Sequence, residues 1–160
     1  MIRVDSRLIH GQVITKWRKI FNITKIVVVD DGLAKDEFMI HMYEAAAPSG
    51  VKVKVYDSEK AKRLWDKNQF GTEGRVLLLF KDIETCHKLY EMGIPMDYIQ
   101  IGGVAKTPDR KVILQAVSIN ESEFRLLEQF HNSGCDVAVQ IVPEDTKLSF
   151  DEIAKKYKAK

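Results

Sequence analysis

The chain has 160 residues, of which 45% are hydrophobic and 30% charged, so it is long enough for one domain with a buried core. Its net charge is only +2 and its basic residues are dispersed, which argues against nucleic acid as a partner. The apolar runs are of strand length rather than membrane length, and the early Arg3 and Asp5 are unlike a signal peptide, so we expect a cytoplasmic protein.

Short apolar segments alternate with amphipathic segments along the chain. The apolar segments predict strands at 1–5, 26–29, 51–56, 75–80, 98–101, 112–117 and 136–142. Apolar residues at helical spacing predict helices at 11–21, 36–47, 83–92, 120–131 and 150–157, and a further helix that Ser58 caps. This alternation predicts an α/β fold with an open, mainly parallel sheet covered by helices on both faces.

Polar groups directly follow several of the predicted strands. They occur at 5–10, 30–31, Asp57, Lys81 and 102–103. The carboxyl ends of parallel strands meet at one edge of a sheet, and ligands bind at that edge. We therefore expect these groups to converge there.

The segment between the first strand and the first helix holds three groups that together suit phosphoryl chemistry. His10 can attack through one ring nitrogen while Asp5 accepts a hydrogen bond from the other, which would fix the tautomer. Arg7 offers a planar set of donors that matches phosphoryl oxygens. We predict catalytic roles for Asp5, Arg7 and His10, and we expect His10 to be exposed.

The start of the first helix adds groups that can bind an anion. The backbone N–H groups of Gly11, Gln12 and Val13 have no partners within a helix and can point at a phosphate. The helix dipole contributes ~0.3–1 kcal/mol for a bound negative group, and Gly11 lets the backbone approach closely. Because positioning and charge stabilisation can carry phosphoryl transfer, we predict a phosphohistidine carrier that needs no metal and no cofactor.

Other interpretations stay open on the residues alone. His10 could be a capping or packing residue, and the first loop could bind an anion without reacting with it. A receiver domain would use 30–31 for magnesium, Asp57 as the phosphoacceptor and Lys81 as its lysine. The receiver interpretation is weaker, because the acidic pair follows the second strand rather than the first and the first loop would have no role.

The first loop belongs to a longer stretch, 3–13 (RVDSRLIHGQV), which closely resembles the opening of the IIB component of the mannose/fructose/sorbose family of the bacterial sugar phosphotransferase system. Further similarity follows in the same order at 28–31, 46–53, 79–81 and 101–103, so that the resemblance covers essentially the whole chain. Ser6 stands where members of that family often carry an acidic residue.

The resemblance implies that residues 1–160 form a single IIB-type domain, an open and mostly parallel sheet of about seven strands, one of them antiparallel. It implies a phosphoryl relay from phosphoenolpyruvate through enzyme I, HPr and the IIA component to His10, with the phosphate on Nδ1. His10 would then phosphorylate a sugar bound by the membrane components IIC and IID, so the protein would be cytoplasmic and peripherally associated with the transporter. Arg7 would clamp the phosphoryl group and Asp5 would orient the loop. The resemblance identifies neither the sugar nor an oligomeric state.

The remaining candidate residues receive no catalytic role. We interpret 30–31 as turn, capping or partner contacts, and 102–103 as glycines that allow a tight turn near the first loop. Lys16 and Lys81 are interpreted as solvated surface lysines in preference to partner contacts. Cys86 and Cys135 are far apart and form no metal-ligand spacing, so we expect buried free thiols.

Overall fold

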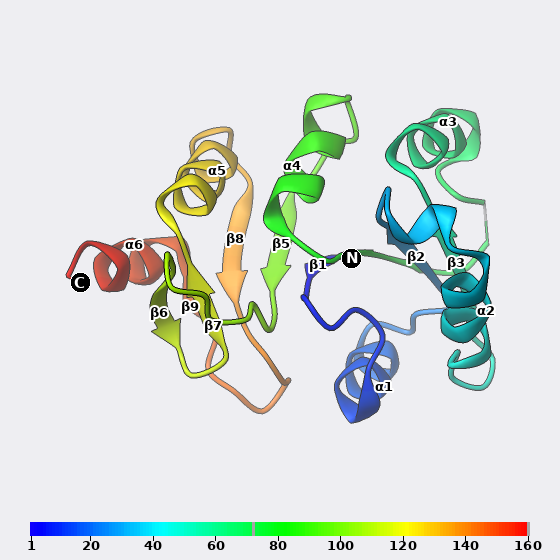
Figure 1. Ribbon diagram of the computed structural model, residues 1–160, viewed down its shortest axis with the longest axis horizontal. Helices are drawn as coiled ribbons and strands as arrows, with labels where there is room; N and C mark the ends of the chain where they lie inside the picture. Colours follow the sequence, from blue (N-terminus) through cyan, green and yellow to red (C-terminus); the bar gives the residue numbers. More distant parts are fainter. Residues whose placement is uncertain (72, 160) are drawn as a thin grey trace.

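A seven-stranded sheet runs through the middle of the molecule (Figure 1). The computed structural model describes residues 1–71 and 73–159, and the side chains of Gln12 and Val13 lie outside the described part. In their order across the sheet, the strands are β3 (Lys52–Tyr56), β2 (Lys25–Val29), β4 (Val76–Phe80), β1 (Ile2–Val4), β5 (Tyr98–Ile101), β8 (Asp136–Val139) and β9 (Leu148–Ser149). Neighbouring strands are parallel except for β8 and β9, which confirms the expected α/β class with a mainly parallel sheet and one antiparallel strand.

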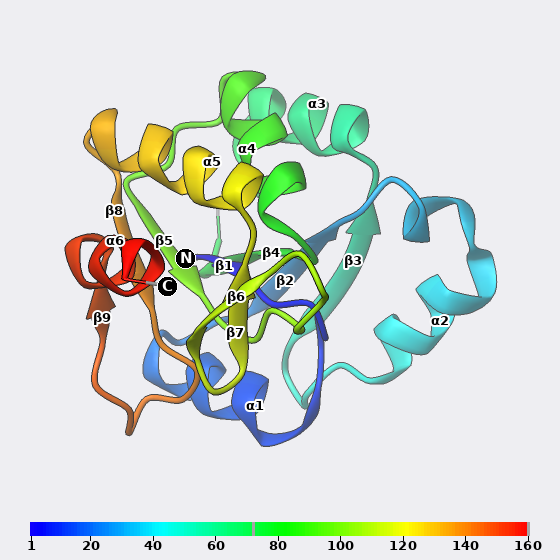
Figure 2. The same cartoon turned by 60° about the vertical axis from the view of Figure 1, so that its left-hand side comes forward.

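Helices cover both faces of the sheet, as expected (Figures 1 and 2). One face carries α1 (Gly11–Ile20) and α2 (Glu37–Ala45), and the short 3₁₀ helix η1 (Leu33–Lys35) precedes α2. The other face carries α3 (Ser58–Asn68), α4 (Ile83–Glu91), α5 (Glu121–Asn132) and, beside α5, α6 (Phe150–Lys158). Within residues 1–71 and 73–159, no helix combines the length and the apolar character that crossing a membrane requires.

Alternation along the central strands supplies two hydrophobic cores. In β2, Val27 and Val29 face the core under α3 to α6, whereas Ile26 and Val28 face the core under α1 and α2. Strand β4 repeats this arrangement. Because both faces of these strands are buried, they are continuous apolar runs in the sequence.

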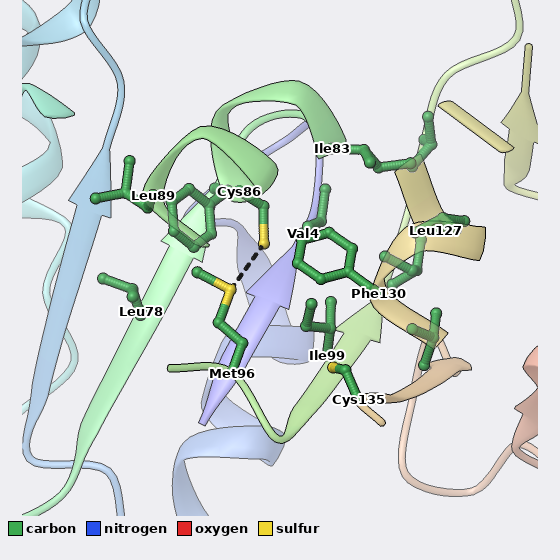
Figure 3. Close-up of a cluster of buried hydrophobic side chains, with 14 of the residues drawn as sticks. Val4, Leu78, Ile83, Cys86, Leu89, Met96, Ile99, Leu127, Phe130 and Cys135 are labelled. Atoms are coloured by element: carbon green, nitrogen blue, oxygen red, sulfur yellow. Dashed lines mark hydrogen bonds between the residues drawn. The ribbon is translucent and has the colours of Figure 1, made fainter. Parts of the chain in front are cut away.

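The larger core lies under α4 and α5 and contains both cysteines (Figure 3). Cys86 and Cys135 are buried free thiols, as expected. The Sγ of Cys86 lies 3.7 Å from the Sδ of Met96, and both side chains pack near Phe130. Burial raises the pKa of the Cys86 thiol and raises that of Cys135 to about 11, so both are packing residues in their protonated form.

The predicted strand at 112–117 is wrong, because the chain forms a hairpin there. Its strands are β6 (Lys111–Leu114) and β7 (Val117–Ile119), which pair antiparallel and form a separate two-stranded sheet. A turn separates them, and the register shifts between Val112 and Leu114. A run of apolar residues with a short turn inside it reads as one strand in the sequence, which explains the error.

The predicted capping role of Ser58 is also wrong. Asp57 is the N-cap of α3, and its side chain accepts a hydrogen bond of 2.7 Å from the Lys60 N–H. Ser58 is the first helical residue and is fully buried. Asp and Ser are both favoured at N-caps, so two adjacent candidates made the helix start ambiguous by one residue.

The first strand places its residues on alternate faces. Ile2 and Val4 pack against the larger core, so Arg3 points to the α1 face, as does the next side chain of that parity, Asp5. β1 lies beside β4, yet the helices that follow these two strands, α1 and α4, cover opposite faces (Figure 1). The loop after β1 is therefore at a topological switch point, where open α/β sheets form binding crevices.

Candidate functional site

The first loop, defined here as residues 5–10, connects β1 to α1 and is fixed to the end of β5. The N–H of Leu8 donates to the Asp5 carbonyl at 2.9 Å, and the N–H of Ser6 donates to the Gly103 carbonyl at 2.8 Å. Leu8 has a φ of +57°, an unfavourable conformation for a branched residue, and its side chain is 1% exposed. Its burial in the α1 core holds this strained turn in place, as is common at functional sites.

Asp5 is the centre of the hydrogen-bond network in this loop, and it is fully buried. Its Oδ1 accepts from the Arg7 N–H at 3.1 Å and from the Arg7 Nε at 3.3 Å. Its Oδ2 lies 3.2 Å from the Arg3 guanidinium, 3.3 Å from His10 Nε2 and 3.3 Å from the Gly103 N–H. Burial by itself would raise the pKa of Asp5, but the Arg7 N–H, the Arg3 charge and the Arg7 side chain together hold it below its usual value.

His10 is the N-cap residue of α1 and has an extended backbone, with a φ of −153°. Its side chain is 19% exposed, which is less than the exposed position we expected, because the ring leans onto Asp5. The Asp5 carboxylate is ionised and can only accept, so the proton of the ring lies on Nε2. This tautomer leaves the lone pair on Nδ1 free to attack an electrophile.

Arg7 is the cationic group at the surface of the site. Its side chain is 48% exposed, although its Nε and Nη2 reach Asp5 at 3.3 and 3.5 Å. A cleft of about 270 Å³ opens beside it, between the first loop and the β6–β7 hairpin. The guanidinium can therefore contact an anion that enters this cleft.

The start of α1 lies directly beside His10. Gly11 is the first residue of the helix and has a φ of +34°, a conformation that favours glycine. An added Cβ at Gly11 would meet nothing within 4 Å among the described residues, so its glycine suits the backbone conformation rather than a close contact. Gln12 and Val13 continue the helix, and their side chains lie outside the described part of the structure.

The other polar groups that follow strands lie at the same edge but serve local structure. Asp30 accepts from the Leu33 N–H at 2.9 Å, and Asp31 accepts from the Ser58 N–H at 2.7 Å and from Lys88 at 3.0 Å. Asp57, as described above, caps α3. These turn and capping roles leave the receiver-domain interpretation without a phosphoacceptor, and its acidic residues follow β2 and β3, which are separated from β1 by β4.

Arg3 was missed in the sequence, and the contacts of Gly102 with the site were not foreseen. Arg3 is fully buried and contacts Asp5, and Gly102 lies so close to both that an added Cβ would be 2.6 Å from Arg3 Cζ and 2.6 Å from Asp5 Oδ2. Gly102 was interpreted as a turn residue near the first loop, and the space it leaves for this pair is a further reason for a glycine there. An arginine in the middle of a short apolar strand was the available signal for Arg3.

The comparison with known families agrees with this geometry. A sequence model described as "PTS system sorbose subfamily IIB component" matches residues 1–160. The chain therefore belongs to the sorbose subfamily of IIB components of the sugar phosphotransferase system. Two curated relatives are named as components of PTS systems specific for mannose and sorbose.

Curated relatives and a solved structure agree on the extent of the similarity. The mannose-specific EIIAB component of Escherichia coli K12 is 32% identical over 98% of this chain and 48% of that protein, so the chain spans about half the length of this relative. The sorbose-specific EIIB component of Lacticaseibacillus casei is 32% identical over 97% of this chain and 93% of that protein. The crystal structure of manxB from Thermoanaerobacter tengcongensis is 44% identical, with a TM-score of 0.92 over 98% of this chain and 95% of that one.

Proposed function

We propose that this protein is the phosphoryl carrier of a sugar transporter, with His10 as the phosphorylated residue. His10 accepts the phosphoryl group on Nδ1 from phospho-IIA and passes it to a sugar bound by the membrane components IIC and IID. The observation that carries the proposal is the 3.3 Å contact between His10 Nε2 and the buried Asp5 carboxylate. That contact leaves Nδ1 as the nitrogen with a free lone pair.

The first transfer balances as an exchange between two imidazoles. The Nδ1 lone pair of His10 forms a bond to phosphorus while the N–P bond of the protonated phosphohistidine on IIA breaks. The donor ring leaves neutral, and the phosphorylated His10 ring becomes cationic with its proton on Nε2. Asp5 faces that proton, so its negative charge stabilises the phosphorylated ring and keeps Nδ1 a good leaving group.

The second transfer reverses the roles. A sugar hydroxyl oxygen forms a bond to phosphorus as the Nδ1–P bond breaks, and His10 returns to its neutral Nε2–H form. The hydroxyl proton goes to a base beside the sugar in the membrane components. Arg7 and the first N–H groups of α1 hold the phosphoryl oxygens in both steps, and these groups can do so without a metal ion.

The surroundings of His10 suit a carrier that meets two macromolecules in turn. The first loop follows the carboxyl end of β1, and the cleft of about 270 Å³ beside Arg7 gives a loop of another protein a place to bind. The relatives are named for mannose and sorbose systems, and the E. coli relative joins EIIA and EIIB in one name. We infer a IIA partner and membrane IIC and IID partners, with the carrier at the cytoplasmic side of the transporter.

The test is intact-protein mass spectrometry at alkaline pH after incubation with phosphoenolpyruvate, enzyme I, HPr and a mannose-family IIA. A single phosphoryl adduct, stable in base and lost in acid, is expected on the wild type and on His41→Gln, a substitution of an exposed histidine on α2. His10→Gln should carry none. An adduct that persists in His10→Gln would disprove the assignment, and no adduct on the wild type would leave only passive anion binding.

A further inference from the structure

Arg3 is a buried charge to which the proposed transfer steps give no role. Its side chain has an exposed fraction of 0%, and its guanidinium donates to Asp5 Oδ2 at 3.2 Å and to the carbonyl oxygens of Gln140 and Ile141, each at 3.0 Å. These two carbonyls follow β8, at the point where the chain leaves the sheet. Arg3 therefore ties the first loop to a segment 137 and 138 residues away in sequence.

Side chains on the α1 face complete the enclosure of Arg3. Gln100, its neighbour in register on β5, accepts from the guanidinium through Oε1. The ring of Trp17 covers the other side, with 5.5 Å between Arg3 Cζ and the ring centroid. With partners on β5, on α1 and after β8, this guanidinium has no freedom to follow a ligand.

Burying an ion pair is a poor way to stabilise a fold, because desolvation offsets most of the attraction. Burial lowers the pKa of Arg3, and Asp5 opposes that shift. Gly102 is adapted to the pair as well, since a Cβ there would overlap both side chains. An apolar residue at position 3 would pack against Trp17 without these requirements, so the arrangement calls for a functional reason.

Arg7 differs from Arg3 in the one property that a phosphoryl clamp needs, which is freedom to move. It is 48% exposed, and its side-chain contacts to Asp5 are 3.3 and 3.5 Å long. When Arg7 turns to the phosphoryl oxygens, Asp5 loses part of its positive surroundings. Arg3 stays, so the carboxylate keeps a counter-ion at the moment when His10 needs an ionised acceptor for its Nε2 proton.

We propose that Arg3 is the fixed counter-ion of Asp5 and thereby a positioning residue for His10, which allows Arg7 to leave Asp5 for the phosphoryl group. This proposal rests on the proposed function of His10. Two arginines share one carboxylate: Arg3 stays as its counter-ion, and Arg7 binds the phosphoryl group. Gly102 leaves the space that Arg3 needs.

The first experiment uses no phosphoryl donor and measures the tautomer of the His10 ring by ¹⁵N NMR. The wild type should show mainly the Nε2–H form. Arg3→Met should lose that preference, whereas Arg3→Lys should keep it because a charge remains beside Asp5. Arg18→Met is the matched control, since Arg18 lies on α1 and donates to the Ser49 carbonyl away from the site. A folded Arg3→Met with the wild-type tautomer would overturn the proposal.

The second experiment is a double-mutant cycle on the rate of phosphoryl acceptance from phospho-IIA. Arg3→Met should slow transfer by at least about tenfold, as a displaced acceptor group does. The same substitution in an Asp5→Asn background should add little further loss, because Arg3 acts through Asp5. Additive losses would mean that Arg3 acts on the fold or on another group.

The third measurement needs no substitution, so it decides the proposal even if Arg3→Met does not fold. The side-chain Nε resonances of Arg3 and Arg7 are followed before and after phosphorylation of the wild type. The Arg7 resonance should shift and the Arg3 resonance should not. An unchanged Arg7 resonance would overturn the proposal that Arg7 leaves Asp5 for the phosphoryl group. If the wild type accepts no phosphoryl group, the proposed function fails, while the tautomer experiment still decides what Arg3 does for His10.

Discussion

Asp5 and Glu123 are both buried carboxylates held by arginine, with exposed fractions of 0% and 1%. Glu123 accepts from Arg110 through Nε at 3.1 Å and through Nη2, and it completes a capping box with Asn120 at the start of α5. Arg110 also donates to the Ala105 carbonyl at 2.8 Å. The Asn120 contacts of Glu123 cap α5, and its Arg110 contacts hold the segment after β5 against α5.

Asp5 has the same chemistry but different partners. Arg7 is about half exposed and His10 is partly exposed, so two of its contacts belong to groups that can meet another molecule. The comparison shows that a buried acid with a guanidinium does not identify a functional site. Arg110 is as exposed as His10, at 19%, but its Nε, Nη1 and Nη2 all donate within the fold. What distinguishes the Asp5 cluster is that its partners include a guanidinium that is 48% exposed and an imidazole whose Nδ1 is left free.

The largest expected effect is on the exposed side of the Asp5 cluster. His10→Ala should abolish phosphoryl acceptance and change the free energy of unfolding by less than ~1 kcal/mol, because the imidazole has one long hydrogen bond and a solvent-facing edge. Phosphoryl labelling and urea unfolding measure the two quantities. Normal phosphoryl labelling of His10→Ala, or failure of this variant to fold, would mean that the Asp5 cluster is structural, as the Glu123 cluster is.

The opposite result is expected in the Glu123 cluster. Arg110→Met leaves a carboxylate that is 1% exposed without its bidentate partner, and it should lower the free energy of unfolding by about 3 kcal/mol. Phosphoryl acceptance by the folded fraction should stay near the wild-type rate. Arg125→Met is the control, because Arg125 pairs with Glu121 at the surface, and the urea midpoint should not change.

Arg7→Ala should slow phosphoryl transfer without abolishing it, and it should change stability little. Removal of a donor that binds the transition state typically costs about a hundredfold in rate, and we expect a loss of that order. Stability should change little, because the Arg7 N–H to Asp5 survives the substitution and the side chain is 48% exposed. Transfer kinetics and thermal melting test this together, and a large drop in melting temperature with normal transfer would make Arg7 structural.

Ionisation of Asp5 should contribute to the pH dependence of stability. Its pKa is lower in the folded protein than in the unfolded chain, so its stabilising contribution is present above the unfolded value of about 3.9 and is lost as the pH falls through the folded value. The free energy of unfolding, measured with urea, should therefore fall more steeply below pH 5 for the wild type than for Asp5→Asn. The ionisable groups that face Asp5 are Arg3, Arg7 and His10. Parallel slopes would show that these groups do not favour its ionised form.

The fold could be predicted where strands are buried on both sides, and the prediction failed where the chain leaves the sheet. β4 is apolar throughout and β2 is apolar after Lys25, and both were predicted within one residue of their observed ends. The strand predicted to reach residue 142 stops at Val139, because the carbonyls of Gln140 and Ile141 turn toward Arg3. β9 has two residues, too few to produce a pattern.

The site shows the same division between local and distant information. Asp5, Arg7 and His10 lie within six residues of one another, and the structure brings all three together as predicted. The roles of Arg3 and Gly102 depend on the pairing of β1 with β5, in which Val4 lies opposite Ile101. That register is a long-range property of the sheet, so no spacing within the first loop could reveal it.

The smallest expected effect concerns a charge outside both clusters. Lys16 on α1 lies 3.1 Å from Glu144, with side chains 41% and 64% exposed, and water and salt screen such a pair. Lys16→Met should leave the urea midpoint unchanged, and the rate of phosphoryl acceptance at low salt should also stay the same, because Glu144 already balances the lysine charge. A slower low-salt rate that recovers to the wild-type value at high salt would instead make Lys16 a contact that steers IIA toward the first loop.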